Sequence, residues 1–537
     1  MMKKEYPLDF VSLPFDRIDE WVENFFLPQT PEDFCAFYNA VKEAYFKVVR
    51  KHEGSFIGDV LLCKIKIYQE FTKVICALNL IKQIEAAGFV PVCGDKSALF
   101  RKLIKKDADF ENSLPFSDLR EKDALHVFYK KMRNILYSMR VNKDILYFFH
   151  SKKDKYRVLN AMPCRETILY SKKINRSFCY ASPLDWLHGS DRVTLDTHIS
   201  EEIYSVSEEI LANMKDVTAK HGLEVPEEIL MTLKKFTVIH ISSSAKEFIA
   251  IRSKIQKSEP FYVLGGNQSS FLNRAVSLCN RKNGGYSLGF NHGNDTFSNR
   301  DLRFEFSIVN EFVTYTDGAA KLLRERNRNV SETLSSNDPE ISSLDTDIYL
   351  NLWLKNKQMP LVEKVKKVML TGYPYDLYET LTYGPPDIAF FDLEFRTIKA
   401  LVDAGFEVIY KAHPEACYHM PNIYGDKVQI VREPFEQLMH ISDAFIFLYS
   451  YTSVFPIGLC TRKPAILLNT LKNHRYHTKE IYELLEKRCK VINVYSGPSN
   501  RFMFDVGEMT EYLKRKHGEP DIELLEKYMF PSNYKKI

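Results

Sequence analysis

Side chains able to bind an anion or move a proton follow several apolar runs in the second half of the chain. After the runs VMLT, EVIY and AFIFLY come Gly372, Tyr373, Lys411, His413, Pro414, Glu415, Ser450, Thr452 and Ser453. Hydroxyls and glycines next to a helix start suit a phosphate, because backbone N–H groups and the helix dipole meet its oxygens. Lysine and histidine side chains add hydrogen-bond donors. This set therefore predicts a site for a phosphate-bearing donor.

A second set of polar residues follows two earlier apolar runs. PFYVLGG ends at Gly266 and is followed by Asn267 and Gln268. YSLGF is followed by His292 and Asp295. His292 could take a proton from an acceptor hydroxyl, and Asp301 and Glu305 are further acid–base candidates near it. A donor site in one half and an acceptor site in the other is the arrangement of a group transferase.

Each of these pieces also has an ordinary explanation. The HP pair could be a plain loop, HGND could be a turn, and SYTS could be a helix N-cap. Their occurrence together, each at the end of an expected strand, favours a site. We expect no metal, because His474 and His477 lack an acidic partner at ligand spacing. GGNQSS is not a dinucleotide fingerprint, because no GxGxxG follows a strand.

The elements that must position these residues alternate between strand and helix. PFYVLGG, YSLGFNHGND and FSIVNEFVTYT are expected strands, and SSFLNRAVSLCNRKNGG and DGAAKLLRERN are expected helices between and after them. The alternation resumes beyond residue 347, with strands in VMLTG, FEVIYKAHP, KVQIV, AFIFLYS and KPAILLN. Such alternation predicts parallel sheets, in which ligands bind outside the carboxyl ends of the strands.

The expected fold class is α/β, with two Rossmann-like domains facing a cleft and a mainly helical N-terminal extension. The polar segment 329–347 is the expected boundary between the two domains. We expect a helical region at 1–150 that could be part of the acceptor domain, an acceptor domain at 151–335, a nucleotide-donor domain at 345–500, and helices at 501–537 that could cross back to the first domain. Long helices are expected at 31–50, 62–88 and 198–222.

Composition narrows the classes of function. The chain has 537 residues and a net charge of only +4, which argues against a dedicated nucleic-acid binder. Its ten cysteines form no CxxC pair, and neither a secretory signal nor a run of 18 apolar residues is visible, so we expect a cytoplasmic protein. The aromatic stretch 8–28 could lie on the cytoplasmic face of a membrane, although packing in a core is the favoured explanation.

The ordered motifs NHG, GYP, KAHPE and SDAFIFLYSYTSVFPIGLCTRKPAILL, within residues 260–475, resemble bacterial GT-B glycosyltransferases that build surface polysaccharides. Two groups are most similar: capsule and lipopolysaccharide transferases that use CMP-linked Kdo or sialic-acid-like sugars, and teichoic-acid CDP-glycerol glycerophosphotransferases. The resemblance implies that His292 is the acceptor-side base, that His413 contacts the donor phosphate or nucleotide, and that Thr452 and Ser453 bind the donor phosphate. It implies no cofactor or metal beyond the nucleotide-sugar substrate.

The chain also departs from the glycerophosphotransferase pattern. Ser450 stands near the first expected aspartate, Thr452 replaces a serine, and Pro456 lies near the second expected aspartate. We therefore expect transfer of a sugar from a nucleotide to a surface polysaccharide or lipid-linked glycan. The alternatives are a CDP-polyol phosphotransferase, a UDP-sugar epimerase of the same fold, and a scaffold without catalytic activity.

Overall fold

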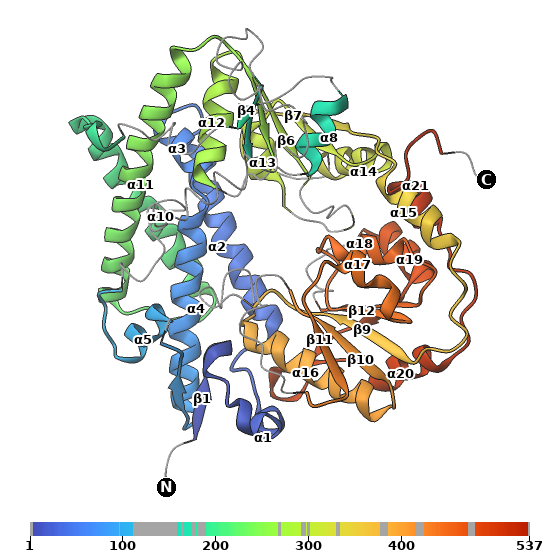
Figure 1. The fold of residues 1–537 in the computed structure, drawn as a ribbon. Coiled ribbons are helices and arrows are strands. Elements are labelled where there is room, and N and C mark those ends of the chain that lie inside the picture. The colour runs from blue at the N-terminus through green and yellow to red at the C-terminus, as the bar shows by residue number, and fades with distance from the viewer. Residues whose placement is uncertain are drawn as a thin grey trace.

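Two parallel β-sheets and a bundle of long helices make up the part of the chain that the structure describes (Figure 1). The computed structural model describes residues 4–95, 97–110, 158–162, 165–173, 179–180, 190–266, 270–291, 297, 301–328, 333–375, 385–413, 424–470 and 478–534. Within these residues, no helix combines the length and the apolar character needed to cross a bilayer.

The N-terminal region is mainly helical over its described residues. Its helices are α1 (Ile18–Asn24), α2 (Pro31–Lys51), α3 (Phe56–Cys63), α4 (Lys66–Ala86) and α5 (Ala98–Ile104), and a short parallel pair joins β1 (Glu5–Pro7) to β2 (Val90–Val92). The hydroxyl of Thr30 starts α2 by accepting a hydrogen bond from the Asp33 amide at 3.1 Å. Helix α4 is buried on all sides from Ile67 to Ala77, so it runs through the interior.

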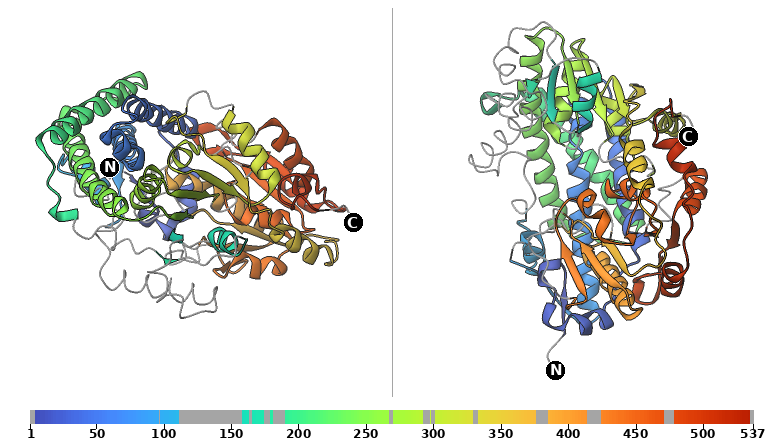
Figure 2. Two further views of the ribbon diagram at one scale, coloured as in Figure 1. Left: turned by 90° about the horizontal axis from the view of Figure 1, so that it is seen from above. Right: turned by 45° about the vertical axis from the view of Figure 1, so that its right-hand side comes forward.

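Two further long helices cover the outer side of this bundle. They are α10 (Thr197–Lys220), which packs against α2, and α11 (Glu227–Gln256), which packs against α10 and α12. Seen from above, they lie on the side of the molecule opposite the C-terminal end (Figure 2). Helix α10 matches the helix expected at 198–222, whereas the sequence patterns did not single out α11.

The first sheet has six parallel strands in the order β4-β3-β5-β6-β7-β8. The strands are β3 (Val158–Met162), β4 (Cys179–Tyr180), β5 (Tyr262–Gly265), β6 (Tyr286–Phe290), β7 (Glu311–Thr314) and β8 (Glu340–Ser343). Its helices are α8 (Arg165–Lys173), α12 (Phe271–Lys282), α13 (Arg303–Ile308) and α14 (Asp317–Arg328). In order of sequence this is 2-1-3-4-5-6, which begins with the order of a flavodoxin-like sheet.

The second sheet also has six parallel strands, in the order β11-β10-β9-β12-β13-β14. The strands are β9 (Lys367–Thr371), β10 (Glu407–Lys411), β11 (Val428–Val431), β12 (Ala444–Phe447), β13 (Ala465–Asn469) and β14 (Lys490–Asn493). Its helices are α15 (Ile348–Lys357), α16 (Asp387–Asp403), α17 (Phe435–Leu438), α18 (Val454–Leu459) and α19 (Lys479–Arg488). Numbered by their order in the sequence, the strands run 3-2-1-4-5-6 across the sheet, which is the Rossmann order. Successive strands are added on one side of β9 up to β11 and then, from β12 on, on its other side.

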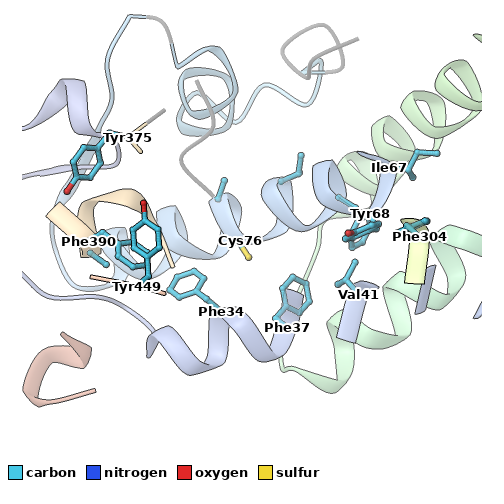
Figure 3. Close-up of a cluster of buried hydrophobic side chains, with 14 of the residues drawn as sticks. Phe34, Phe37, Val41, Ile67, Tyr68, Cys76, Phe304, Tyr375, Phe390 and Tyr449 are labelled. Atoms are coloured by element: carbon cyan, nitrogen blue, oxygen red, sulfur yellow. The ribbon is translucent and has the colours of Figure 1, made fainter. Parts of the chain in front are cut away.

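One buried hydrophobic cluster joins the N-terminal helices to both sheets. Figure 3 shows Phe34 and Cys76 of α2 and α4 near Tyr449 and Phe390 of the second sheet unit. The ring of Phe10 stacks on Tyr375 at 4.9 Å. Most apolar side chains of the stretch 8–28 are buried in this cluster, which confirms core packing as the favoured explanation for that stretch.

The C-terminal segment first contacts the second sheet unit and then returns to the first. An antiparallel pair, β15 (Tyr495–Ser496) and β16 (Phe502–Met503), is followed by α20 (Val506–Lys514) and α21 (Glu523–Tyr528). The hydroxyl of Thr316 donates to the Tyr528 carbonyl at 2.5 Å. Gly318 of α14 lets α21 approach, because a Cβ there would lie 1.9 Å from the Lys527 carbonyl oxygen. Figure 1 shows α20 near the second sheet and α21 near α15, on the way to α14.

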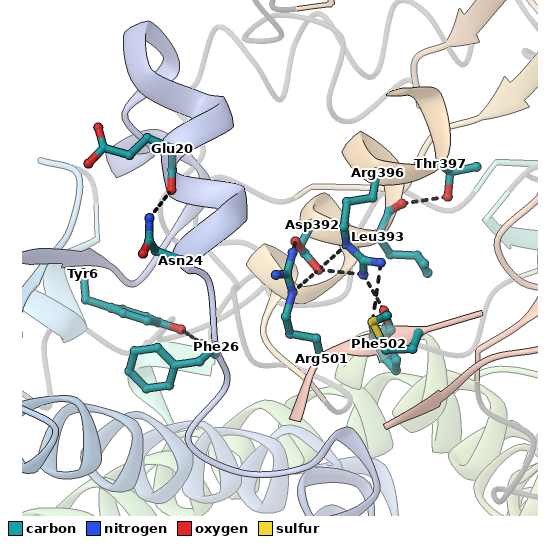
Figure 4. Close-up of polar contacts among 11 residues, drawn as sticks. Tyr6, Glu20, Asn24, Phe26, Asp392, Leu393, Arg396, Thr397, Arg501 and Phe502 are labelled. Carbon is teal, nitrogen blue, oxygen red and sulfur yellow. Dashed lines mark hydrogen bonds and ion pairs between the residues drawn. The ribbon is translucent and has the colours of Figure 1, made fainter. Parts of the chain in front are cut away.

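A buried ionic cluster fastens this segment to α16. Asp392 accepts hydrogen bonds from Arg396 Nη2 at 2.8 Å and from Arg501 Nε at 3.3 Å (Figure 4). The Asp392 side chain has 0% exposure, while both guanidinium groups reach solvent in part. Because the charges are paired, their burial is tolerated.

The α/β class with parallel sheets is confirmed, with three local differences. Residues 303–308, partly expected as strand, form the short helix α13, in which residues 304–308 are all buried. A short run of consecutive buried residues does not distinguish a helix from a buried strand. The segment 329–347, expected as a linker, contains the edge strand β8, which pairs with β7. The segment PFEQLMHISD predicts a short helix with Pro434 as its first residue, whereas Pro434 is the N-cap of α17.

Candidate functional site

The loops after β9 and β12 meet at the point where the second sheet reverses its strand order. The described residues directly after β9 are 372–375, and the loop after β12 is 448–453. The rings of Tyr373 and Tyr449 contact edge to face, with centroids 5.9 Å apart. In doubly wound sheets the crevice at this point is where ligands bind. The structure thus brings together two of the loops that the sequence marked as donor-binding.

Strand β10 delivers two further predicted residues next to these loops. Lys411 pairs in register with Thr371, and its carbonyl accepts a hydrogen bond from the Gly372 amide at 2.9 Å. The ammonium group of Lys411 is buried and donates to the Ala412 carbonyl at 2.6 Å. Lys411 therefore shapes the strand end in addition to supplying positive charge.

His413 is half-buried just beyond Lys411. Burial, together with the positive charge of Lys411, lowers the pKa of His413 to about 4. At neutral pH the imidazole is uncharged, so it offers one N–H donor and one acceptor nitrogen. Its chemistry fits a hydrogen bond to a phosphate or a nucleotide better than an ion pair.

The hydroxyl-rich loop after β12 divides into a buried and an exposed part. Ser450 is buried, Thr452 is half-buried, and Ser453 is exposed. Ser453 is the N-cap of α18, but its side chain accepts no hydrogen bond from the first turn of that helix, all of whose residues the structure describes. The ordinary explanation of SYTS as a helix N-cap is therefore correct for the position of Ser453, although the cap forms without a side-chain hydrogen bond.

A buried glutamate on α16 holds the loop after β9. Glu394 Oε1 accepts a hydrogen bond from the Tyr373 amide at 2.5 Å. Glu394 Oε2 accepts hydrogen bonds from the hydroxyls of Tyr375 at 2.5 Å and Tyr410 at 2.9 Å. Burial raises the pKa of Glu394 to about 8, and the three hydrogen bonds offset this only in part. The carboxyl group is therefore mostly protonated at neutral pH.

Gly372 is required by the close approach of this loop to β10. A Cβ at Gly372 would lie 2.3 Å from the Tyr410 hydroxyl oxygen, which Glu394 holds in place. The sequence predicts that Gly372 lets a ligand approach, whereas in the structure Gly372 lets the Tyr410 hydroxyl approach. Sequence reasoning missed Glu394 and Tyr410, and the one available signal was a carboxylate among aromatics in the run FFDLEF.

Aromatic rings lie between α16 and the loops after β9 and β12. Tyr373 stacks on Phe390 of α16, with centroids 4.1 Å apart and planes 9° apart. The Tyr449 ring lies 4.4 Å from that of Tyr451, which is 37% exposed. A continuous series of rings therefore runs from the buried helix α16 to the surface at the candidate site.

Much of the acceptor-side prediction lies outside the described residues. This holds for Asn267, Gln268, His292 and Asp295, and on the donor side for Pro414 and Glu415. Gly266 is described and is buried directly after β5. Asn291, directly after β6, is also buried, and its side-chain oxygen has no hydrogen-bond partner among the residues that the structure describes.

Asp301 has a structural contact that does not suit a general acid. It forms ion pairs with Lys42 at 3.0 Å and with Arg303 at 2.7 Å, which join α2 to α13. These hydrogen bonds and charges hold the pKa of Asp301 below its ordinary range despite burial. Asp301 is thus ionised at neutral pH and links α2 to α13. Glu305, the other candidate, is buried within α13.

In the described part of the chain, no group of three or more His, Cys, Asp and Glu side chains is placed to hold a metal ion. Comparisons of the chain with protein-family models, with curated proteins and with solved structures found no match. The resemblance to glycosyltransferases therefore remains a prediction from motifs.

Proposed function

We propose that this protein is a GT-B glycosyltransferase whose second sheet unit binds a nucleotide-activated sugar. The observation that carries the proposal is the Rossmann strand order, which puts the loops after β9 and β12 side by side at the reversal point. The polar residues Lys411, His413 and Ser450–Ser453 stand at the same edge of that sheet. Ligand binding at this edge is the general property of such sheets.

The roles of the donor-side residues follow from their chemistry. The hydroxyls of Ser450, Thr452 and Ser453 and the neutral His413 ring supply donors for the phosphate that leaves when the bond from the anomeric carbon to the phosphate oxygen breaks. The acceptor hydroxyl forms the new bond to that carbon. On the acceptor side, His292 is the proposed base that takes the hydroxyl proton, with Asp295 beside it in sequence.

The proposed acceptor is a surface polysaccharide or a lipid-linked glycan. Two six-stranded parallel sheets, with a C-terminal helix that returns from the second to the first, support the two-domain GT-B reading. The preferred donor is a CMP-linked Kdo or sialic-acid-like sugar, which rests on the motifs alone. Work at the cytoplasmic face of a membrane is part of the same proposal.

A thermal-shift screen with CMP, CDP, UDP and GDP tests the proposal. A ligand at 100 times its dissociation constant stabilises the folded state by about 2.7 kcal/mol, which is readily measured. Stabilisation by CMP alone supports the Kdo or sialic-acid class. A response to CDP alone favours the polyol phosphotransferase, and a response to UDP alone favours the epimerase. No shift with any nucleotide overturns the proposal and favours the scaffold.

The variant His413→Ala tests the placement of the site. Loss of a hydrogen bond to a charged phosphate costs about 1.5–3 kcal/mol, so we expect nucleotide affinity to fall about 10- to 100-fold. His440→Ala is the matched control, because His440 is an exposed histidine on the short 3-10 turn after α17. Equal affinity of the two variants would show that the nucleotide does not bind at the end of β10.

A further inference from the structure

Two fully buried carboxyl groups lie two residues apart on α16, in opposite surroundings. Asp392 faces Arg396 and Arg501 and forms ion pairs with both (Figure 4). Glu394 faces the carboxyl ends of β9 and β10, where a backbone amide and tyrosine hydroxyls contact it. Within the described residues, no lysine, arginine or histidine forms an ion pair with Glu394. Asp392 therefore forms ion pairs, whereas Glu394 forms hydrogen bonds with the loop after β9 and with β10.

The three hydrogen bonds of Glu394 join helix α16 to the loop after β9 and to strand β10. One bond goes to the backbone of the loop after β9, at Tyr373. The second goes to the side chain of Tyr375 in the same loop, whose ring is covered by Phe10 from the N-terminal region. The third goes to Tyr410 of β10. A single carboxyl group thus sets the loop after β9 relative to the neighbouring strand and the helix beneath it.

The loop that Glu394 holds leads directly to the candidate ligand site. Tyr373 carries its ring between Phe390 and Tyr449. Tyr449 precedes Ser450 and packs against the exposed Tyr451. A shift of the Tyr373 backbone therefore moves the ring against which Tyr449 packs. Tyr449 belongs to the loop after β12, which carries the proposed phosphate-binding hydroxyls.

We propose that Glu394 is the positioning residue of this site: it fixes the loop Gly372–Tyr375, and through the ring of Tyr373 the loop after β12, in the arrangement that binds the nucleotide. The part that concerns nucleotides rests on the proposed function. The part that concerns the loop is independent of it.

The protonation state of Glu394 makes this positioning role dependent on pH. The titratable groups that face the carboxyl are Tyr375 from the loop after β9, Tyr410 from β10 and Tyr424 from the segment before β11, and all three are neutral phenols with raised pKa values. Burial raises the pKa of Glu394 to about 8, so ionisation above that pH places among them a charge that the three hydrogen bonds compensate only in part. The loop, and nucleotide affinity with it, should weaken as the pH rises through this range.

Glu394→Gln and Glu394→Ala are the informative variants, with Asp392→Asn as the matched control. Gln keeps the shape and neutrality of the protonated carboxyl, whereas Ala removes every bond to the loop. Asp392→Asn perturbs an equally buried carboxyl of the same helix that does not contact the loop. Two readouts are needed: amide hydrogen exchange at residues 371–373 and 375 without ligand, and titration of CMP between pH 6 and pH 9.

We expect Glu394→Ala to speed exchange of the Tyr373 amide at least tenfold and to lower CMP affinity about tenfold. Wild-type affinity should fall above pH 8, while Glu394→Gln should keep its affinity across the series. Asp392→Asn should leave exchange and affinity unchanged. Should Glu394→Ala not fold, the pH series of Glu394→Gln decides alone.

Three results would overturn the inference: unchanged loop exchange in Glu394→Ala, a pH profile of Glu394→Gln identical to that of the wild type, or the same loosening of the loop in Asp392→Asn. Absence of nucleotide binding to the wild-type protein would instead refute the proposed function. In that case the exchange measurement still decides whether Glu394 positions the loop.

Discussion

The buried carboxyl of Glu394 should make the stability of the fold fall as the pH rises. Its pKa is about 8 in the folded chain, against an ordinary value of 4.5. Between these two values the unfolded chain releases the proton and the folded chain keeps it. The folded state therefore binds more protons, and the free energy of unfolding decreases with pH. The stabilising contribution is fully present below pH 4.5 and is lost as the pH rises to about 8.

The size of the effect follows from the same two values. The difference is 8 − 4.5 = 3.5 units, and each unit corresponds to about 1.4 kcal/mol, so the total is about 5 kcal/mol. The slope within this range is about 1.4 kcal/mol per pH unit. Glu394 is fully buried, so screening by solvent does not reduce this value as it would for an exposed group.

The variant Glu394→Gln isolates this contribution, because glutamine does not titrate and keeps the shape of the protonated acid. Unfolding by urea is measured for both proteins at a series of pH values from 4 to 9. We expect the free energy of unfolding of the variant, minus that of the wild type, to rise steadily between pH 4.5 and 8 and to be level outside that range. Other groups titrate equally in both proteins and cancel in the difference.

Parallel pH curves for the two proteins would refute the reasoning. They would mean that the carboxyl ionises in the folded state at its ordinary pKa, so that water or a cation reaches it. An infrared band of a protonated carboxyl group, present in the wild type at pH 6 and absent from Glu394→Gln, provides an independent check of the same point.

Three further substitutions test the packing around the site and the return of the C-terminal segment. Gly372→Ala should cost about 1–3 kcal/mol of stability in urea unfolding, because its Cβ would lie 2.3 Å from the Tyr410 hydroxyl; a neutral effect would show that this loop can move away. Asp392→Ala should cost about 3–5 kcal/mol in the same assay, because it leaves two guanidinium groups without their buried partner; a loss below 1 kcal/mol would contradict the pairing. Gly318→Ala should expose the C-terminal segment to limited proteolysis, because its Cβ would lie 1.9 Å from the Lys527 carbonyl oxygen; an unchanged digestion pattern would contradict that contact.

The elements with strong local signals were predictable. Helices α2 and α10 begin at side-chain N-caps, α4 is a long apolar segment, and glycines follow α4 and α10 closely. Strands β5, β9, β10, β12 and β13 are short apolar runs bounded by polar residues. Helix α11 was not predicted, because His240 and Ser242–Ser244 interrupt its apolar pattern. Strand β8 lies in a polar segment and is stabilised by pairing with β7. Its own residues do not predict this pairing.

The candidate site was predictable only as a set of strand ends. Gly372, Lys411 and Ser450 stand where the sequence placed them, because the end of a strand depends on local residues. The sequence did not predict which of these residues lie side by side, because it does not give the order of the strands in the sheet. Glu394 was missed because nothing in its own helix reveals that it reaches Tyr410, which lies 16 residues later on strand β10.

The sequence by itself determined the alternation of strands and helices, the parallel class of the sheets, and the residues delivered to the strand ends. These properties depend on residues within one element and on how apolar side chains repeat along it. Only the tertiary structure decided that β12 lies beside β9, so that Tyr373 meets Tyr449, and that Glu394 is buried among tyrosines. Strand order and desolvation are set by contacts between distant segments, and desolvation changes the proton affinity of a carboxyl that in sequence is an ordinary glutamate.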